Sequence, residues 1–392
     1  MSRAARLGGR EVVIVAAVRT AIGRGHPEKG YYRDVHPSTL LARTLEELIR
    51  RSGIDPAEVE DVIGGCVQQF GEQAFNITRN AWLQAGLPME TPATTVDRQC
   101  GSGQQAVNFA AALIASGVHD VAIGCGVEHM GHISFADGLE VQKEHGYAFT
   151  PELMERYDLI PQGLSAEMIA EKWEIPRSEL DELGLRSQQL AQQATEEGRF
   201  EREIMPFQVN GDTYVTDQGL RETTLEGLAA LKPAFKEDGK ITAGNSSQVS
   251  DGAAAVLLMA REKAAALGLA PRARIFDQLT VGVDPVIMLT GPIPATEQLL
   301  ERNSMRIDDI ELIEVNEAFA SVVAAWRREL EPDMDRVNVN GGAIALGHPL
   351  GSSGARLITT LLHEMERSDK ELGLVTMCCG GGLGTGTMIR RV

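Results

Sequence analysis

A cysteine at position 100 lies where a β-prone run gives way to a helix-forming run. Gly101 and Gly103 follow it and permit a tight turn, and residues 106–114 are strong helix formers. We therefore expect Cys100 at a helix N-terminus, where unpaired N–H groups and the positive end of the helix dipole favour the nucleophilic thiolate. A buried structural cysteine is the alternative interpretation of this residue taken alone.

Two further residues of chemically useful type lie in glycine-rich segments of the second half. His348 stands between Gly347 and Pro349, where an imidazole can accept a proton from a thiol or donate an N–H to an oxyanion. Cys378 ends an apolar run ahead of glycines 380–382, whose N–H groups suit a developing negative charge. A structural histidine and a tight glycine hairpin between two terminal strands are the alternatives.

Composition narrows the class of protein. The chain has 392 residues and a net charge of −18, with 43% hydrophobic residues. This length predicts two or three units, and the acidic balance argues against nucleic-acid binding. No apolar run approaches the ~20 residues of a membrane span, and the first ten residues show no secretory signal. Five cysteines without zinc-ligand spacing predict a reduced cytoplasmic protein without a metal site.

The elements that must position these residues alternate between apolar strands and amphipathic helices, which predicts an α/β layered architecture. The expected strands are residues 11–18, 59–67, 94–99 and 120–126, and the expected helices are residues 37–53 and 76–86. Between about 127 and 245 charge density rises and the strong patterns become helical, at 165–173 and 176–199. We expect an inserted, mostly helical domain there.

The second half of the chain repeats the first. Residues 61–65 and 311–315 are similar β-prone runs displaced by 311 − 61 = 250 positions, and glycine turns at 101 and 351 are displaced by 351 − 101 = 250. An apolar helix follows each turn. We predict two duplicated α/β halves whose loops meet in one cleft. The predicted division is an N-terminal half at 1–126 completed by about 246–270, an inserted domain at 127–245, and a C-terminal half at 271–392.

Four motifs together resemble the signature blocks of the thiolase family. They are residues 97–103 (Asp-Arg-Gln-Cys-Gly-Ser-Gly), 316–319 (Asn-Glu-Ala-Phe), 347–349 (Gly-His-Pro) and 378–382 (Cys-Cys-Gly-Gly-Gly). The motifs occur in the family's order, and the similarity covers essentially the whole chain. The resemblance implies a five-layered αβαβα fold, a homodimer or homotetramer, and an inserted domain that binds coenzyme A.

The resemblance also implies a role for each site residue. Cys100 would be the nucleophile that takes the acyl group, His348 would activate it, and Cys378 would be the second acid and base. Asn316 would hold a water in one oxyanion hole, and the backbone N–H groups of Cys100 and Gly380 would form the other. Acyl transfer suits a soft nucleophile that is also a good leaving group, and a thioester enolate needs a proton donor.

The same resemblance implies contacts for coenzyme A. Ser247 matches a serine that contacts the pantetheine arm, and Ala243 and Gly244 lie in the same Gly/Ser-rich loop. Arg221 matches a basic residue near the nucleotide, although a solvated arginine is the alternative. An acidic protein must supply local cations to a phosphate-rich substrate. We expect coenzyme A and acyl-CoA as substrates and no permanently bound cofactor.

One segment departs from the short-chain members of the family. Residues 161–167 read Pro-Gln-Gly-Leu-Ser-Ala-Glu, where acetoacetyl-CoA thiolases resemble His-Met-Gly-x-x-Ala-Glu. The His-Met pair that narrows their acyl pocket is missing, which argues against acetoacetyl-CoA as the main substrate. Residues 64–73, 217–224 and 331–340 are instead similar to degradative 3-ketoacyl-CoA thiolases, especially actinobacterial enzymes of steroid side-chain β-oxidation.

The resemblance therefore implies thiolytic cleavage of a bulky or longer 3-ketoacyl-CoA, such as one with a steroid side chain, to acetyl-CoA and a shortened acyl-CoA. A biosynthetic acetyl-CoA acetyltransferase that uses the same residues is one alternative. A non-catalytic acyl-CoA or lipid binder is another, and the intact set of Cys100, His348, Cys378 and Asn316 argues against it.

Overall fold

The computed structural model describes residues 9–392 of the chain. Residues 1–8 lie outside the described part. They make up most of the first ten residues, in which the sequence shows no secretory signal. Within residues 9–392, no helix has both the length and the apolar character needed to cross a membrane.

The strands of the first half form one side of a mixed, 11-stranded sheet. β1 (Val12–Thr20), β5 (Val121–His129) and β9 (Ser250–Ala260) are buried along their whole length. Burial on both faces explains their nearly continuous apolar sequences. β3 (Asp61–Gly65) runs parallel to β5 and to the edge strand β4 (Ala93–Val96). Antiparallel pairing of β5 with β9 and of β9 with β1 completes the order β4-β3-β5-β9-β1.

The strands of the second half repeat this arrangement. β11 (Leu312–Val315) runs parallel to β12 (Leu372–Cys379). β12 then pairs antiparallel with β13 (Leu383–Arg391), and β13 pairs antiparallel with β10 (Ala273–Gly282). The order β11-β12-β13-β10 matches β3-β5-β9-β1 in sequence and in direction. This match confirms the duplication predicted from the 250-residue spacing.

The two half-sheets are joined to each other at one point. β1 and β10 pair antiparallel through Val13 with Arg274 and Ile14 with Ala273. This short pairing, which the sequence did not predict, makes one continuous sheet of the two halves.

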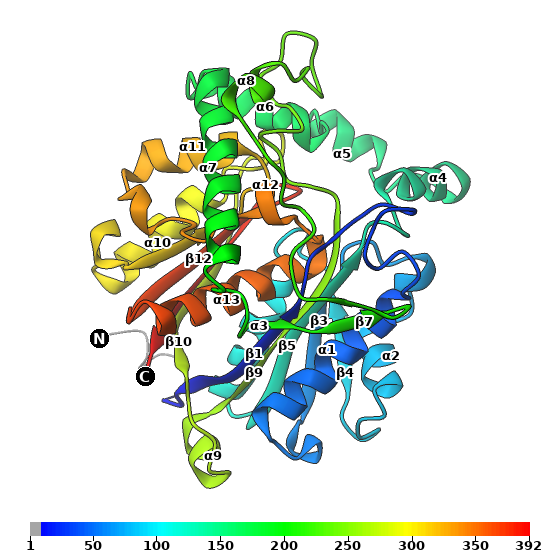
Figure 1. The fold of residues 1–392 in the computed structure, drawn as a ribbon, viewed down its shortest axis with the longest axis vertical. Helices are drawn as coiled ribbons and strands as arrows, with labels where there is room; N and C mark the ends of the chain where they lie inside the picture. Colours follow the sequence, from blue (N-terminus) through cyan, green and yellow to red (C-terminus); the bar gives the residue numbers. More distant parts are fainter. Residues whose placement is uncertain (1–8) are drawn as a thin grey trace.

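Helices form three layers around the half-sheets (Figure 1). One pair covers the outer face of the first half-sheet, a second pair covers the outer face of the second, and a third pair lies between them. These pairs are α1 (Pro37–Ser52) with α2 (Ile77–Gln84), α10 (Pro292–Asn303) with α11 (Ala320–Leu330), and α3 (Ser102–Ala115) with α13 (Leu350–Arg367). The five-layered αβαβα fold is therefore confirmed.

The two central helices approach each other closely at glycines. A Cβ atom on Gly103 of α3 would lie 2.7 Å from the carbonyl oxygen of Gly351 in α13, and one on Gly354 would collide with the backbone of Gln104. Only glycine allows two helices to come this close. We call Gly103, Gly351 and Gly354 the glycine seam, because they bring the first turns of the two helices together.

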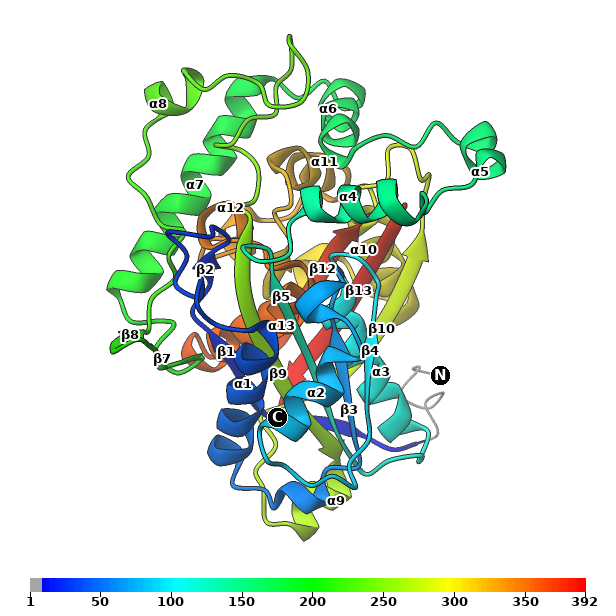
Figure 2. The same cartoon turned by 90° about the vertical axis from the view of Figure 1, so that its right-hand side faces the viewer.

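The helices of the segment between β5 and β9 lie toward one end of the molecule (Figure 2), whereas the strand at Ile204–Met205 in the same segment pairs with β1. α6 (Gln162–Lys172) and α7 (Arg177–Glu196) pack against α11. α4 (Phe135–His145) and α5 (Pro151–Arg156) bury none of their side chains fully. The segment runs from His129 to Ser250, close to the predicted 127–245, and the division into domains stays a prediction.

The remaining elements are short. They are β2 (Gly23–Arg24), β6 (Ile204–Met205), β7 (Phe207–Val209), β8 (Asp212–Tyr214), α8 (Leu225–Ala229), α9 (Arg261–Ala266), α12 (Ala343–Leu346) and 3-10 turns at Pro56–Glu58, Gly71–Gln73, Ile307–Asp309 and Met334–Arg336.

Candidate active site

Cys100 lies two residues before α3, at the end of a turn that side chains hold in place. The Ser102 hydroxyl accepts a hydrogen bond from the Arg98 N–H at 2.8 Å and donates to the Gln99 carbonyl at 2.6 Å. Gln99 has a φ of 49°, a left-handed conformation that is unfavourable for a residue with a side chain. The sequence correctly predicted the position of Cys100 ahead of a helix.

The ionisation state of Cys100 differs from the expectation. The residue is 4% exposed, and burial raises the pKa of its thiol to about 11. The backbone N–H groups of Gly380 and of Cys100 itself act against this rise by hydrogen bonding to the sulfur. The expected N–H donors are therefore present and favour the thiolate, but desolvation of the charged form outweighs them, so the net shift of the pKa is upward. Cys100 is a neutral thiol at neutral pH.

Cys378 and Cys379 end β12, and glycines 380–382 turn the chain into β13. The last two of these glycines have φ angles of 78° and 76°, so the backbone is the glycine hairpin considered as an alternative. Burial raises the pKa of both thiols, and a negative charge on nearby Cys100 raises it further. The hairpin therefore brings Cys378 and the Gly380 N–H to the nucleophile.

His348 lies two residues before α13, as Cys100 lies before α3. Its Nδ1 is 2.6 Å from Ser353 Oγ, and that hydroxyl donates its own hydrogen to the Pro349 carbonyl at 2.8 Å. Ser353 must therefore accept the Nδ1–H, which leaves Nε2 unprotonated. Burial lowers the pKa of His348 to about 3, and the positive charge of Arg356 adds to this effect. The imidazole is a neutral proton acceptor at neutral pH.

Asn316 links His348 to the strand that carries Cys378. Its side-chain Nδ2 lies 3.3 Å from His348 Nε2, and its backbone N–H donates to the Thr376 carbonyl on β12 at 3.0 Å. Among residues 9–392, its buried Oδ1 has no hydrogen-bond partner. Asn316 therefore offers a free polar atom to a water or a substrate next to the imidazole.

The duplicated fold explains why these residues meet. The glycine seam brings together the helix openings that follow Cys100 and His348. Parallel pairing of β11 with β12 places Asn316 beside the end of the strand that carries Cys378. All five predicted catalytic residues, which are Cys100, His348, Cys378, Asn316 and Gly380, therefore come from four turns at the junction of the halves.

The structure adds two residues to those predicted at this junction. Gln162 begins α6, and a Cβ atom on Gly380 would lie 2.7 Å from its Nε2. Glu128 is a buried carboxylate near the end of β5 that accepts backbone N–H groups from Val67 at 2.9 Å and from Gly351 at 2.8 Å. Glu128 could have been identified from the sequence, because it is an acidic residue in an apolar strand. Gln162 lies in the segment 161–167 that the sequence already indicated at the acyl pocket, but its approach to Gly380 follows only from the fold.

An apolar cavity of about 720 Å³ opens beside the nucleophile. Its inner end includes Gln99, Gln162 and Gly380. Its wall is formed mainly by apolar side chains of α4, α5 and the loops that follow them, namely Phe135, Leu139, Phe149, Leu153, Tyr157, Leu159, Ile160, Pro161, Pro285 and Met288. This cavity can take a hydrocarbon group that is attached at Cys100.

A second cavity of about 650 Å³ contains part of the predicted coenzyme A set. Arg221 and Gly244 line it, and Arg221 Nη2 donates to the Ala243 carbonyl at 3.1 Å. Ser247 lies outside the lining, where its N–H donates to the Ala318 carbonyl at 3.0 Å. The structure thus groups Arg221, Ala243 and Gly244, while Ser247 sits closer to the Asn316 turn.

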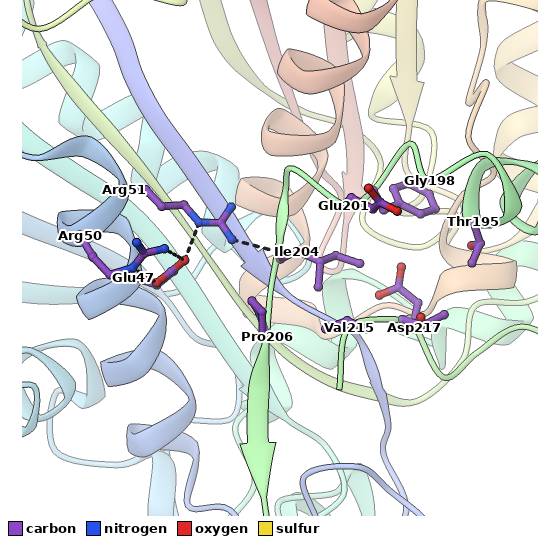
Figure 3. A pocket seen from close by; sticks show the side chains of 12 residues that line it. Glu47, Arg50, Arg51, Thr195, Gly198, Glu201, Ile204, Pro206, Val215 and Asp217 are labelled. Atoms are coloured by element: carbon purple, nitrogen blue, oxygen red, sulfur yellow. Dashed lines mark hydrogen bonds and ion pairs between the residues drawn. The ribbon is translucent and has the colours of Figure 1, made fainter. Parts of the chain in front are cut away.

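A third cavity, of about 480 Å³, lies between α1 and the β6 segment (Figure 3). Both of its arginines are occupied, because Arg50 and Arg51 each bind Glu47 and Arg51 also donates to the carbonyls of Arg202 and Ile204. The cavity includes none of the predicted site residues. Within residues 9–392, no group of three or more His, Cys, Asp and Glu side chains has an arrangement suited to a metal ion.

Comparisons with known proteins agree with this geometry. The family model "Thiolase, N-terminal domain" matches residues 12–262, and "Thiolase, C-terminal domain" matches residues 269–391. Steroid 3-ketoacyl-CoA thiolase FadA6 of Mycobacterium tuberculosis is 45% identical over 97% of this chain and 94% of that protein. A 3-ketoacyl-CoA thiolase of Marinobacter nauticus is 44% identical over 98% of this chain and 100% of its own length.

A comparison with solved structures also finds a protein of similar fold. The crystal structure of the Bacillus anthracis acetyl-CoA acetyltransferase superposes with a TM-score of 0.89 at 40% identity and covers 98% of this chain and 99% of that one. Family models that span both halves, relatives matched over nearly their full length and the shared fold lead to one conclusion: the chain belongs to the thiolase family.

Proposed function

We propose that this thiolase cleaves a bulky or longer 3-ketoacyl-CoA with coenzyme A and releases acetyl-CoA and an acyl-CoA two carbons shorter. The observation that carries the proposal is the apolar cavity of about 720 Å³, which reaches the turn of Cys100 through Gln99 and Gly380. This volume is much larger than an acetyl group needs, and its lining suits a hydrocarbon. The similarity to a steroid thiolase supports a steroid side chain as one such group.

The first half-reaction forms an acyl-enzyme. His348 Nε2 takes the proton of the Cys100 thiol while the sulfur attacks the 3-keto carbon, so that a thiolate need not accumulate in the buried site. The carbonyl oxygen becomes negative and accepts the N–H groups of Cys100 and Gly380. The bond between carbons 2 and 3 then breaks, and its electron pair passes to carbon 2 as the enolate of acetyl-CoA. Cys378 protonates that carbon, and Asn316 stabilises the enolate oxygen through a water.

The second half-reaction releases the shortened acyl group. The Cys378 thiolate takes the thiol proton of an incoming coenzyme A, whose sulfur attacks the thioester on Cys100. The Cys100 thiolate leaves and recovers its proton from His348, so both cysteines return to neutral thiols. The high pKa of Cys378 in its apolar site suits removal of the coenzyme A proton, because a thiolate with a high pKa is a strong proton acceptor.

For coenzyme A we propose the second cavity. Arg221 supplies a cation for a phosphate, and Gly244 in the lining, with the adjoining Ala243 that Arg221 contacts, supplies a small surface against which the nucleotide part can lie. Ser247 lies next to Ala318, in the turn that follows Asn316. That position suits a contact with the pantetheine arm as the arm passes toward the reaction centre.

We also propose that the protein works in the cytoplasm as a homodimer or homotetramer. β4 is an edge strand with an exposed Thr94, and neighbouring Phe75 is 93% exposed. An open edge with a large exposed aromatic side chain suits pairing with a second copy. All five cysteines are free, in keeping with a reducing compartment. Size-exclusion chromatography with light scattering on wild type and Thr94→Pro tests the oligomer.

Thiolysis rates with three substrates test the proposed reaction. Acetoacetyl-CoA, a long straight-chain 3-ketoacyl-CoA and a steroid side-chain 3-ketoacyl-CoA should be compared by kcat/KM. We expect the two large substrates to exceed acetoacetyl-CoA by at least about tenfold, the factor that 1.4 kcal/mol of extra apolar burial in the transition state provides.

The opposite ranking would favour the biosynthetic acetyl-CoA acetyltransferase. If none of the three substrates formed an acyl adduct on the protein, as judged by intact-protein mass spectrometry without free coenzyme A, catalysis of this kind would be ruled out. The non-catalytic binder would then be the better interpretation.

A further inference from the structure

Polar side chains are unevenly distributed in the acyl cavity. Its wall is mainly aromatic and aliphatic, with Gln68 and Gln142 at α4, whereas Gln99 and Gln162 lie at the end next to the nucleophile. The Gln99 amide is already committed, because its Nε2 lies 3.2 Å from both carboxylate oxygens of Asp97. Among the described residues, the Gln162 side chain has no hydrogen bond to a protein nitrogen or oxygen. Its amide is therefore the available donor at this end.

The fold holds Gln162 firmly in this place. It is the first residue of α6, and the next turn of that helix is buried. Ser165 Oγ donates to the Val286 carbonyl at 2.7 Å, and a Cβ atom on Gly163 would collide with the ring of Phe235. The start of the helix therefore has little freedom to move. The Gln162 amide approaches Gly380, one of the two residues whose N–H groups point at the Cys100 sulfur.

We propose that Gln162 is a further catalytic residue, a third hydrogen-bond donor to Cys100 Sγ beside the backbone N–H groups of Cys100 and Gly380. It stays neutral and transfers no proton. Its task is to stabilise the sulfur as negative charge develops during attack and again when the thiolate leaves. The inference rests on the proposed function for the reaction it serves, but the contact itself is independent of any substrate.

The chemistry of the site explains why an amide suits this position. Burial makes ionisation of Cys100 costly, and a hydrogen bond donated by Gln162 would offset part of that cost. A lysine or arginine would stabilise the thiolate more strongly, but it would place a full charge in a cavity that must receive a hydrocarbon. A neutral donor at the boundary serves both the polar reaction centre and the apolar wall.

Alkylation of Cys100 by iodoacetamide across a pH range tests the contact, with the modified cysteine identified by peptide mass spectrometry. Gln162→Met keeps the length of the side chain and removes the donor. We expect the apparent pKa of Cys100 to rise by about half to one unit, which slows alkylation at pH 8 about three- to tenfold. Gln162→Glu should raise the pKa further, because it places a carboxylate beside the thiolate.

The matched control is Gln193→Met on the exposed face of α7, where the amide donates to Glu197. This variant should alkylate like wild type. With a 3-ketoacyl-CoA that the enzyme turns over, Gln162→Met should lower kcat about three- to tenfold and change KM by less than about twofold. A loss confined to KM would mean that Gln162 only shapes the cavity, and would overturn the proposal.

Unchanged alkylation profiles in both Gln162 variants, with native circular dichroism, would also overturn it. The alkylation assay needs no substrate, so its result separates the two proposals. A shifted alkylation pKa without any turnover of a 3-ketoacyl-CoA would leave the Gln162 contact in place and remove the proposed function alone.

Discussion

The turns that open α3 and α13 occupy equivalent places in the duplicated fold, yet they carry opposite chemistry. The turn before α3 presents Cys100 with N–H groups aimed at its sulfur, behind a strained Gln99. The turn before α13 presents His348, whose Nδ1–H is held by Ser353. One copy has become the proton donor and nucleophile, and the other has become the base. Duplication therefore supplied the geometry, and local hydrogen bonds assigned the roles.

Removing the nucleophile should cause the largest loss of thiolysis. Cys100→Ala leaves the base and both helix openings intact, so we expect thiolysis to fall by about 10⁴-fold or more. The 3-ketoacyl-CoA should leave no acyl adduct in intact-protein mass spectrometry. Turnover at a comparable rate in this variant would show that the acyl group is not carried by Cys100.

Removing the base is the next largest change. His348→Gln keeps a hydrogen-bonding side chain of similar size but has no proton acceptor of suitable strength. We expect kcat to fall by about 10²- to 10⁴-fold. Alkylation of Cys100 at high pH, where hydroxide removes the proton, should stay close to wild type. A similar loss in both assays would point to a damaged site rather than a missing base.

The two turns should also differ in how they respond to acid. The pKa of His348 is about 3 in the folded chain and 6.5 as the ordinary value. Between these values the unfolded chain binds a proton that the folded chain does not, so stability falls as pH decreases below 6.5. Wild type should lose about 2 kcal/mol more unfolding free energy than His348→Gln between pH 7 and pH 5. Urea denaturation at both pH values checks this, and equal losses would contradict neutral burial of the imidazole.

The smallest expected effect on activity comes from removing the hydrogen bond that sets the tautomer of His348. Ser353→Ala removes the acceptor of the Nδ1–H, and we expect kcat to fall about three- to tenfold with KM nearly unchanged. Ser352→Ala is the matched control, because its hydroxyl also donates to the Pro349 carbonyl but does not contact His348. Equal effects of the two substitutions would show that packing around the helix start, not the tautomer, is responsible.

Much of this arrangement followed from local sequence patterns. Glycine turns, apolar strands and the 250-residue spacing gave the duplicated fold and the positions of Cys100 and His348 ahead of helices. The pairing of β1 with β10 was not predictable, because side-chain alternation does not reveal which strands from different halves meet. The sequence indicated residues 161–167 at the acyl pocket, but the approach of Gln162 to Gly380 was not predictable for a related reason, since it depends on the placement of α6.

The protonation state of Cys100 is a second property that local sequence patterns did not predict. A helix N-terminus is visible in the sequence, so a stabilised thiolate was the natural expectation. Burial depends on how both halves pack over the turn, and its effect on the pKa proved larger than that of the donors. Local patterns identified the groups near the thiol, but the sign of the net shift depended on the complete fold.

The glycine seam makes stability and catalysis depend on the same few atoms. Cys100 and His348 come from different halves, so the distance between nucleophile and base is set by how closely α3 and α13 approach. A methyl group at Gly103 would push against the Gly351 carbonyl and force apart the two helix openings that follow Cys100 and His348. Substitutions there cannot be sorted into folding defects and catalytic defects, and evolution of one half is constrained by the shape of the other.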